Sequence, residues 1–444
     1  MANVFENINL RVKGGTQYQK VDGFGVNINS KYWDEGRLIP VMDLLLDDLG
    51  ATLYRVDIYG KSDWVDPDNT KDVSVLNEKT YSEVYSSEVF RNGWAMMKYL
   101  NDKGIEPYLT CSGDVPKWML GADEKTLVQY EQFCDMLVSL IEWAKNKEHI
   151  HFKYFGPLNE TDIGSPEGPT LLPEGYAQVL QILDRKLKEK GLDEIRLVVA
   201  EQSDFNADYV KKFVQYKELA GRIGVFGLHT YGDLSCDRYK EITEAIKDTP
   251  FKSHSIWMSE YGDLDQTGEK EWCIAWKSTS RLLDTLKAGF SGALVWDAYD
   301  NYHDHDGAWT IYGLFRSARK IYTPKKRYYA AKQIFKYVLP GFERVDVDVE
   351  CKDIKVLAFA NQDRTEFTLV GMNISSKDVY ATAWLDKFAE NIKHCKVSHF
   401  RTSENENCYK VEDADFRSTI NANTYEGLKV HIPAYCIFTL TNIV

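Results

Sequence analysis

Two glutamates each follow an apolar stretch of the chain. Glu160 ends Phe155-Gly-Pro-Leu-Asn-Glu, after the aromatic run 151–155, and Glu260 ends His254-Ser-Ile-Trp-Met-Ser-Glu. A carboxylate at the exit of a buried parallel strand opens into the mouth of an α/β barrel, where such folds place their chemistry. Two carboxyl groups that share one cleft can cleave a glycosidic bond. The sequence therefore predicts a paired carboxyl site made of Glu160 and Glu260.

Eight apolar segments are expected to form the strands that position this pair, and segments with helical periodicity separate them. The expected strands are 22–28, 52–58, 105–111, 151–155, 195–201, 224–231, 254–260 and 291–297. The expected helices are 38–49, 94–101, 127–145, 176–190, 209–220, 239–247, 272–287 and a closing helix 328–337. This alternation predicts an α/β fold, a (β/α)8 barrel over residues 22–338. An open doubly wound sheet would need a Gly-rich phosphate turn after the first strand, and the sequence has none.

The pattern of the chain changes after Pro340-Gly341. Alternating or continuous apolar segments, separated by Asn, Asp, Ser and Gly, predict an antiparallel β-sandwich over residues 339–444. Residues 5–21 precede the barrel and are predicted to form two short strands around a Gly14-Gly15 turn. An isolated strand pair is marginal in water. We therefore expect residues 1–21 to join the C-terminal sheet and to make one domain with it.

Composition limits the classes of partner. The formal net charge of −13 over 444 residues disfavours nucleic acid and anionic membrane as partners. The surplus of 11 Trp and 27 Tyr suits a carbohydrate partner, since aromatic faces pack against sugar rings, although β-rich domains share it. No signal peptide is visible, so a cytoplasmic location is expected, or a secreted one if such a peptide was removed. The eight Cys show no CxxC spacing and are expected to be free thiols.

Several motifs, in order along the whole chain, resemble the landmarks of glycoside hydrolase family 30. They are Tyr18-Gln-Lys-Val-Asp-Gly-Phe-Gly, Val115-Pro-Lys-Trp-Met, Asn159-Glu160, Ser259-Glu260-Tyr and Tyr328-Tyr with Leu339-Pro-Gly341. Members of that family are retaining β-glycosidases of the large (β/α)8 clan A, with a side β-sandwich built from both termini. The resemblance implies that Glu160 is the acid/base and Glu260 the nucleophile. It also matches Arg55 to an arginine beside the nucleophile and Tyr231 to a tyrosine on the sixth strand.

Other candidate substrate-binding residues have a structural alternative. Asn159 is expected to donate to the sugar 2-hydroxyl, a contact that strengthens as charge develops. Trp118 and Trp296 are each either a sugar-stacking platform or part of the core. His229 is either a site residue or a satisfied core histidine. Arg55 could instead form a structural ion pair within the barrel.

The segment Asp300-Asn-Tyr-His303-Asp304-His305-Asp306-Gly307 has the look of a metal site. It lacks the later acidic ligand of a calcium loop, so a polar substrate-binding loop is expected there, with no metal and no cofactor. Two rival functions remain open from the sequence. One is a non-catalytic carbohydrate-binding protein on a decayed barrel, and the other is a metal-dependent hydrolase that uses the His303–Asp306 cluster.

Overall fold

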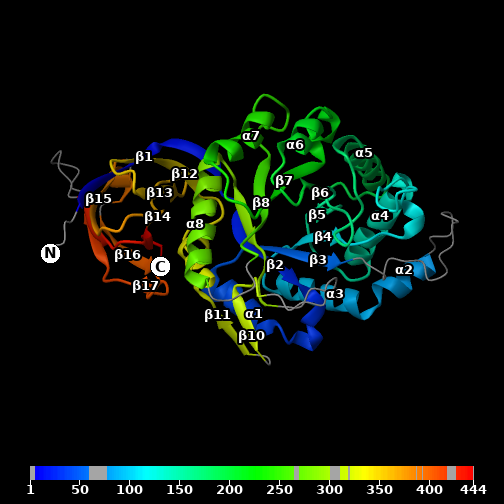
Figure 1. Cartoon of the computed structure of the whole chain (residues 1–444), viewed down its shortest axis with the longest axis horizontal. Helices are drawn as coiled ribbons and strands as arrows, with labels where there is room; N and C mark the ends of the chain where they lie inside the picture. Colours follow the sequence, from blue (N-terminus) through cyan, green and yellow to red (C-terminus); the bar gives the residue numbers. More distant parts are fainter. Residues whose placement is uncertain are drawn as a thin grey trace.

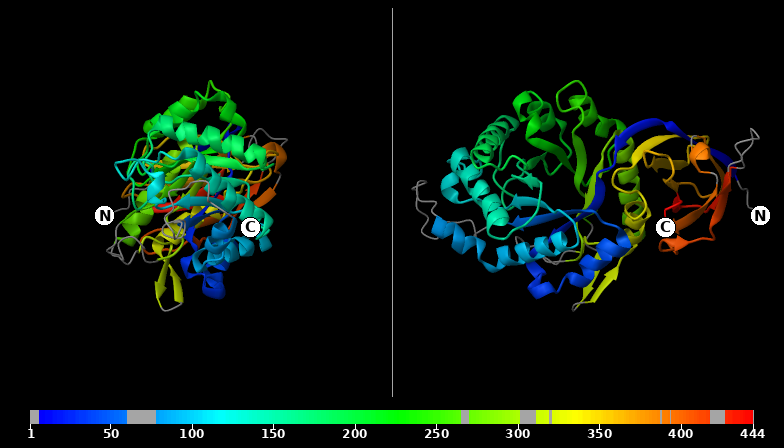
Figure 2. Two further views of the ribbon diagram at one scale, coloured as in Figure 1. Left: turned by 90° about the vertical axis from the view of Figure 1, so that its right-hand side faces the viewer. Right: turned by 180° about the vertical axis from the view of Figure 1, so that it is seen from behind.

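A computed structural model describes residues 6–59, 78–264, 270–300, 311–318, 321–386, 388–392, 394–417 and 427–443. Figure 1 shows two parts, a barrel ringed by helices and a smaller curled β-sheet at one end of the long axis. The first and last strands of the described chain, β1 (Glu6–Lys20) and β20 (Cys436–Thr441), both belong to the curled sheet, which lies beside the barrel in the reverse view of Figure 2 as well. Within the described ranges, every helix is too short or too polar to cross a membrane.

Eight parallel strands close the barrel in chain order. They are β2 (Gly23–Asn29), β3 (Leu53–Tyr59), β4 (Tyr108–Ser112), β5 (Tyr154–Gly156), β6 (Arg196–Ala200), β7 (Ile223–Thr230), β8 (Ser255–Tyr261) and β9 (Gly292–Val295). Each overlaps one of the eight segments predicted as strands, and β2 pairs with β9 to close the ring. The predicted (β/α)8 barrel is therefore confirmed.

The helices that follow these strands cover the outside of the barrel. They are α1 (Ile39–Asp43), α2 (Glu78–Tyr85), α3 (Glu88–Asp102), α4 (Tyr130–Asn146), α5 (Pro173–Glu189), α6 (Ala207–Phe213), α7 (Cys236–Ile246), α8 (Glu271–Ala288) and α9 (Lys326–Phe335). Helix α1 continues into a π-helical turn, Leu44–Leu49. Helix α2 lies in a segment for which no helix was predicted. The prediction of one helix over 209–220 was wrong, because that segment is α6 followed by a separate 3₁₀ helix, Lys217–Gly221.

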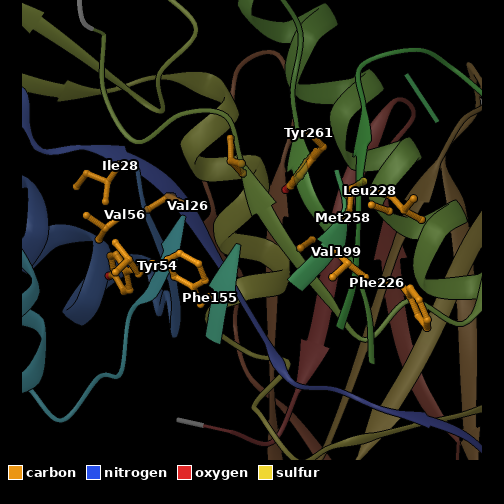
Figure 3. Close-up of a cluster of buried hydrophobic side chains, with 14 of the residues drawn as sticks. Val26, Ile28, Tyr54, Val56, Phe155, Val199, Phe226, Leu228, Met258 and Tyr261 are labelled. Carbon is orange, nitrogen blue, oxygen red and sulfur yellow. The ribbon is translucent and has the colours of Figure 1, made fainter. Parts of the chain in front are cut away.

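Alternate side chains of each barrel strand face opposite sides, because strand side chains have a period of two. Outward-facing residues such as Val26, Tyr54 and Met258 belong to one large buried cluster between the barrel and its helices (Figure 3). A separate inward-facing cluster fills the barrel near the start of the strands. Its buried members are Tyr108, Val198, Val225, Trp257 and Leu294. This apolar cluster fills the interior at the start of the strands, and the polar residues of the interior gather at the carboxyl ends of the strands.

The second part is a ten-stranded sheet that curls around its own apolar core. Its strands are β1 (Glu6–Lys20), β12 (Glu343–Val349), β13 (Ile354–Ala360), β14 (Phe367–Asn373), β15 (Val379–Leu385), β16 (His394–Thr402), β17 (Tyr409–Lys410), β18 (Ala414–Arg417), β19 (Leu428–Ile432) and β20 (Cys436–Thr441). Strand β1 pairs antiparallel with β12 and parallel with β15. The predicted union of the N-terminal segment with the C-terminal sheet is confirmed. The division of the chain at residues 21/22 and 338/339 stays a prediction.

The N-terminal segment differs from its prediction in one respect. Residues 6–20 form one strand of 15 residues, not two short strands around a Gly14-Gly15 turn. Pairing with β12 shifts register between Lys13 and Gln17 and again before Lys20. The glycines therefore lie at an irregularity of a continuous strand. Strand β12 pairs with the chain before and after the glycines, and β15 pairs with it up to Val12, so an extended chain keeps hydrogen bonds that a local hairpin would lose.

Helices α8 and α9 join the two parts. The buried Gln333 of α9 donates from Nε2 to Thr402 Oγ1 (2.8 Å), and its backbone carbonyl accepts from Thr439 Oγ1 (2.7 Å). Lys355 of β13 donates to Ser280 Oγ (2.8 Å) and Asp284 (2.9 Å) of α8. Buried hydrogen bonds of this kind fix the position of one part on the other. Two short strands, β10 (Phe315–Ala318) and β11 (Ile321–Pro324), form a separate hairpin beside the barrel.

Candidate active site

Charged side chains converge at the carboxyl ends of the barrel strands. Arg55 lies on β3, His229 on β7 and Glu260 on β8, while Glu201 directly follows β6 and Glu160 lies four residues beyond β5. Arg55, Glu201 and His229 are at most 1% exposed, and Glu260 is 4% exposed. Burial of this many ionisable groups is costly unless they pair with one another. These residues do so.

Glu260 accepts hydrogen bonds at both carboxylate oxygens. Arg55 Nη1 donates to Oε1 (2.5 Å), and the Tyr231 hydroxyl donates to Oε2 (2.6 Å). The guanidinium also donates from Nη1 to Asn27 Oδ1 (2.9 Å) and from Nη2 to Asn159 Oδ1 (2.8 Å). Arg55 is therefore held by residues of β2, of β8 and of the loop after β5, and it contacts Glu260 directly, as expected. Two donors, one on each oxygen, fix the orientation of the Glu260 carboxyl group.

An irregularity in β8 turns Glu260 into the barrel. The register with β7 runs Leu228 to Met258 and then His229 to Glu260, so Ser259 is an extra residue. Met258 belongs to the outer cluster, whereas the Ser259 hydroxyl lies on the inner side, 2.8 Å from where a Cβ of Gly227 would be. Without the bulge, strict alternation would turn Glu260 outward with Met258. The bulge therefore directs both Ser259 and Glu260 inward.

Glu160 lies against His229. The carboxylate Oε1 is 2.8 Å from His229 Nδ1, and the same nitrogen is 3.5 Å from Glu260 Oε2. The backbone amide of Glu160 donates to the Glu201 carbonyl (2.8 Å), which fixes the start of the loop after β5. Burial raises the pKa of Glu160, and its bond to His229 opposes that rise without cancelling it. Glu160 therefore tends to keep its proton.

Asn159 connects Arg55 to the loop that follows β5. Its Oδ1 accepts from Arg55, and its Nδ2 lies 3.5 Å from Glu167 Oε2. Burial, reinforced by the charges of Glu160 and Glu260, raises the pKa of Glu167 to about 8. With Glu160, Glu260, Tyr231 and His229, the structure thus brings together six of the eight residues predicted for the site.

The two tryptophans lie apart from this hydrogen-bonded cluster. Trp118 is in the short 3₁₀ helix Lys117–Met119 and packs half-buried against the outer core. Its indole N–H is buried and has no hydrogen-bond partner among the described residues. Trp296 follows β9, and its backbone amide donates to the Tyr261 carbonyl (2.8 Å), which places it at the mouth of the barrel. Sugar stacking on either ring stays a prediction. The His303–Asp306 segment lies outside the described residues.

Four residues of the cluster were missed in the sequence: Asn27, Asp57, Tyr108 and Glu201. Glu201 carried a signal similar to that of Glu260, a carboxylate at the end of an apolar strand. Asp57 accepts from Ser112 Oγ (2.5 Å), and burial raises its pKa to about 6. Asn27 and Tyr108 gave no signal, because they act on Arg55 and Glu201 only through contacts between strands.

Ligand atoms of Glu160, His229 and Glu260 lie within 4.8 Å of one another, close enough to share a metal ion. A histidine ligand must be neutral. Burial alone would lower the pKa of His229, but Glu260, Glu160 and Glu201 together raise it to about 10. The imidazole is therefore held as a cation, which suits an ion pair with carboxylates better than metal binding.

Comparison by sequence gives no match, either to a family model or to a curated protein. Comparison of structures gives many matches along the whole chain. A conserved exported protein from Bacteroides fragilis has a TM-score of 0.73 at 16% identity and covers 97% of this chain and 99% of its own. The glycoside hydrolase family 30 subfamily 8 xylanase from Clostridium acetobutylicum has a TM-score of 0.70 at 16% identity, with 98% and 99% covered. An endo-β1,6-glucanase has a TM-score of 0.69 at 16% identity, with 100% and 96% covered.

These likenesses span both the barrel and the side sheet. The chain therefore has the fold of family 30 glycoside hydrolases, a (β/α)8 barrel with a side β-sheet domain. At this level of identity the likeness defines the fold, and the chemistry has to be argued from the residues of the site.

Proposed function

We propose that the protein is a retaining β-glycoside hydrolase, in which Glu160 is the acid/base and Glu260 the nucleophile. The observation that carries the proposal is the spacing of the two carboxyl groups, which offer oxygens within 4.8 Å of each other. Retaining glycosidases hold their carboxyl groups about 5–5.5 Å apart, whereas inverting enzymes separate them by about 6.5–9.5 Å to admit a water. Glu260 is therefore close enough to attack the sugar directly.

The environments of the two groups support different roles. In the first step Glu160 gives its proton to the leaving oxygen, and the raised pKa that burial causes keeps that proton available. Glu260 attacks the anomeric carbon as the carboxylate that Arg55 and Tyr231 hold by hydrogen bonds. The glycosidic bond breaks as the ester bond to Glu260 forms, and the aglycone leaves with the proton.

In the second step water attacks the anomeric carbon and displaces Glu260, so that the ester bond is hydrolysed. Esterification removes the negative charge of Glu260, which is one of the causes of the raised pKa of Glu160. Glu160 therefore stays ionised more readily and is available to accept a proton from the attacking water, and the sugar leaves with its original β-configuration. Asn159, held by Arg55, is placed beside Glu160 to donate to the sugar 2-hydroxyl.

A β-linked oligosaccharide or polysaccharide is the substrate class that this mechanism serves. Two of the structures with this fold are a xylanase and an endo-β1,6-glucanase, so β-xylan and β-1,6-glucan are the first polymers to test. A panel of p-nitrophenyl β-glycosides should be assayed beside them. Turnover of a β-glycoside that survives a chelator would disfavour both the non-catalytic barrel and the metal-dependent hydrolase.

Stereochemistry tests the mechanism. Proton NMR of the earliest product should show the β-anomer, because two displacements at the anomeric carbon restore the configuration. A first-formed α-anomer would contradict the assignment of Glu260 as nucleophile, and absence of turnover across the panel would contradict the function.

A further inference from the structure

A third strand-end glutamate lies beneath the proposed catalytic pair. Glu201 follows β6 and is fully buried. Its Oε2 accepts from the Tyr108 hydroxyl (2.6 Å), and its Oε1 lies 3.5 Å from Arg55 Nε and 3.9 Å from His229 Nε2. Arg55 and His229 are the two cations that contact Glu260 and Glu160 from the other end of each side chain. The Glu201 carboxylate therefore faces both Arg55 and His229.

We propose that Glu201 is a positioning residue of this active site, which holds Arg55 and His229 in the orientations from which they contact Glu260 and Glu160. The inference rests on the proposed function. Glu201 itself reaches the catalytic pair only through these two cations and through its backbone carbonyl, which accepts from the Glu160 amide (2.8 Å). Side chain and backbone thus fix both halves of the pair from below.

The neighbouring strands are shaped around this carboxylate. A Cβ on Gly156 of β5 would lie 2.3 Å from the Tyr108 hydroxyl and 3.1 Å from Glu201 Oε2. A Cβ on Gly227 of β7 would lie 2.9 Å from Glu201 Cγ. Contacts below 3.0 Å require the neighbouring atoms to move. Glycine on both sides of β6 therefore makes the space that Glu201 and its tyrosine occupy.

Charge balance gives a second reason. Two buried cations, Arg55 and His229, face two carboxylates, Glu201 and Glu260, and Glu160 adds a carboxyl group that can release or accept a proton. The other titratable groups around Glu201 are the hydroxyls of Tyr108 and of Tyr176 on α5. Tyr231, Asp57 and Glu167 also face Arg55 or His229. Removing the charge of Glu201 leaves two cations with one dedicated anion, so one of them must change its orientation or lose a proton.

The test uses Glu201→Gln, which keeps the shape and removes the charge, and Tyr108→Phe, which removes one donor to Glu201. Tyr54→Phe is the matched control, because it deletes a buried hydroxyl from β3 that has no hydrogen-bond partner among the described residues. Each kcat is expressed per site titrated with an activated 2-deoxy-2-fluoro β-glycoside, so that partial misfolding cannot imitate a loss of positioning.

Glu201→Gln should lower kcat by about 10- to 100-fold with KM changed less than about two-fold, because the residue orients catalytic groups and touches no substrate. Tyr108→Phe should lower kcat by a few-fold, and Tyr54→Phe should match the wild type. In NMR titration of labelled histidines, the pH at which His229 is half protonated should be lower by about one pH unit or more in Glu201→Gln than in the wild type, since a facing anion is lost.

Two results would overturn the inference. One is a Glu201→Gln enzyme whose kcat per titrated site equals that of the wild type, and the other is an unchanged His229 midpoint. The NMR titration needs no substrate, so it tests the role of Glu201 even if the wild type hydrolyses no glycoside. A wild type without turnover refutes the proposed function instead, and the two failures stay distinguishable.

Discussion

The interior of the barrel has two layers that share the same strands and differ in chemistry. In the lower layer Val198, Val225 and Trp257 pack with one another as an apolar cluster. In the upper layer, three or four residues further along the same strands, stand Glu201, His229 and Glu260. Tyr108 belongs to both layers. Its ring lies edge-on to that of Trp257, with the ring centroids 6.3 Å apart, and its hydroxyl donates to Glu201.

The difference separates stability from chemistry. Burial of apolar side chains stabilises the fold by about 25 cal/mol per Å². Buried ionised groups gain little over apolar residues of similar size, because desolvation offsets their mutual attraction. The lower layer is therefore expected to support the barrel, and the upper layer to hold charges that the fold itself does not need. Substitutions in each layer test this division.

The largest effect is expected for Glu260→Gln. Loss of the nucleophile should lower kcat by about 10⁴-fold or more, while the melting temperature should change little because Arg55 keeps Glu201 as a partner. In the wild type, an activated 2-deoxy-2-fluoro β-glycoside should inactivate the enzyme with time, and peptide mass spectrometry should place the label on Glu260. A label elsewhere would assign the nucleophile to another residue.

Glu160→Ala should show a smaller loss that depends on the leaving group. Hydrolysis of poor leaving groups should fall by about 10²- to 10⁴-fold, because they need a proton, and activated aryl glycosides should lose far less. Azide should restore the rate and give a β-glycosyl azide, since it replaces the base-assisted water in the second step. Equal losses for both substrate classes, with no effect of azide, would remove Glu160 from this role.

Trp257→Ala in the lower layer should do the opposite. It removes a buried ring and the bond from Trp257 Nε1 to Asp22 Oδ2 (2.8 Å), so the free energy of unfolding should fall by about 3–5 kcal/mol. Activity per titrated site should stay within a few-fold of the wild type at temperatures where the variant is folded. Tyr409→Ala, at an aromatic residue 55% exposed, is the control and should change stability by less than about 1 kcal/mol. Equal stability of both variants would refute the supporting role of the lower layer.

The sequence predicted the part of the structure that follows from continuous apolar runs. All eight barrel strands were located because strands buried on both faces are almost wholly apolar, and the strand-end glutamates stand out at their ends. The bulge at Ser259 could not be predicted, since it exists only in the pairing of β8 with β7. Glu201 could have been found by the rule that found Glu260. Its connection to Arg55 through the barrel interior depends on the close approach of four strands, which no local pattern records.

The long strand β1 shows the same limit outside the barrel. Its Gly14-Gly15 pair is a sound local signal for a turn. The tertiary structure overrides it, because β12 pairs with the chain on both sides of the glycines, at Lys13 and at Gln17, and β15 pairs with it up to Val12. Local preference decides such a segment only when no neighbouring strand is available.

The smallest expected effect concerns the pH dependence of stability that a buried carboxyl group of the upper layer causes. Glu167 in the upper layer has a pKa of about 8, above the ordinary value of 4.5, because burial and nearby carboxylates disfavour its charge. The folded protein therefore binds more protons than the unfolded chain between about pH 4.5 and 8, and this group's contribution to stability falls as pH rises through that range. Glu167→Gln, which imitates the protonated form, should have nearly the stability of the wild type near pH 4.5 and exceed it at pH 8, where the wild-type side chain loses its proton. Urea unfolding at the two pH values measures the difference, with the exposed Glu106→Gln as the control. A gain of the same size at both pH values would show that packing, and not the charge of Glu167, limits the stability of the upper layer.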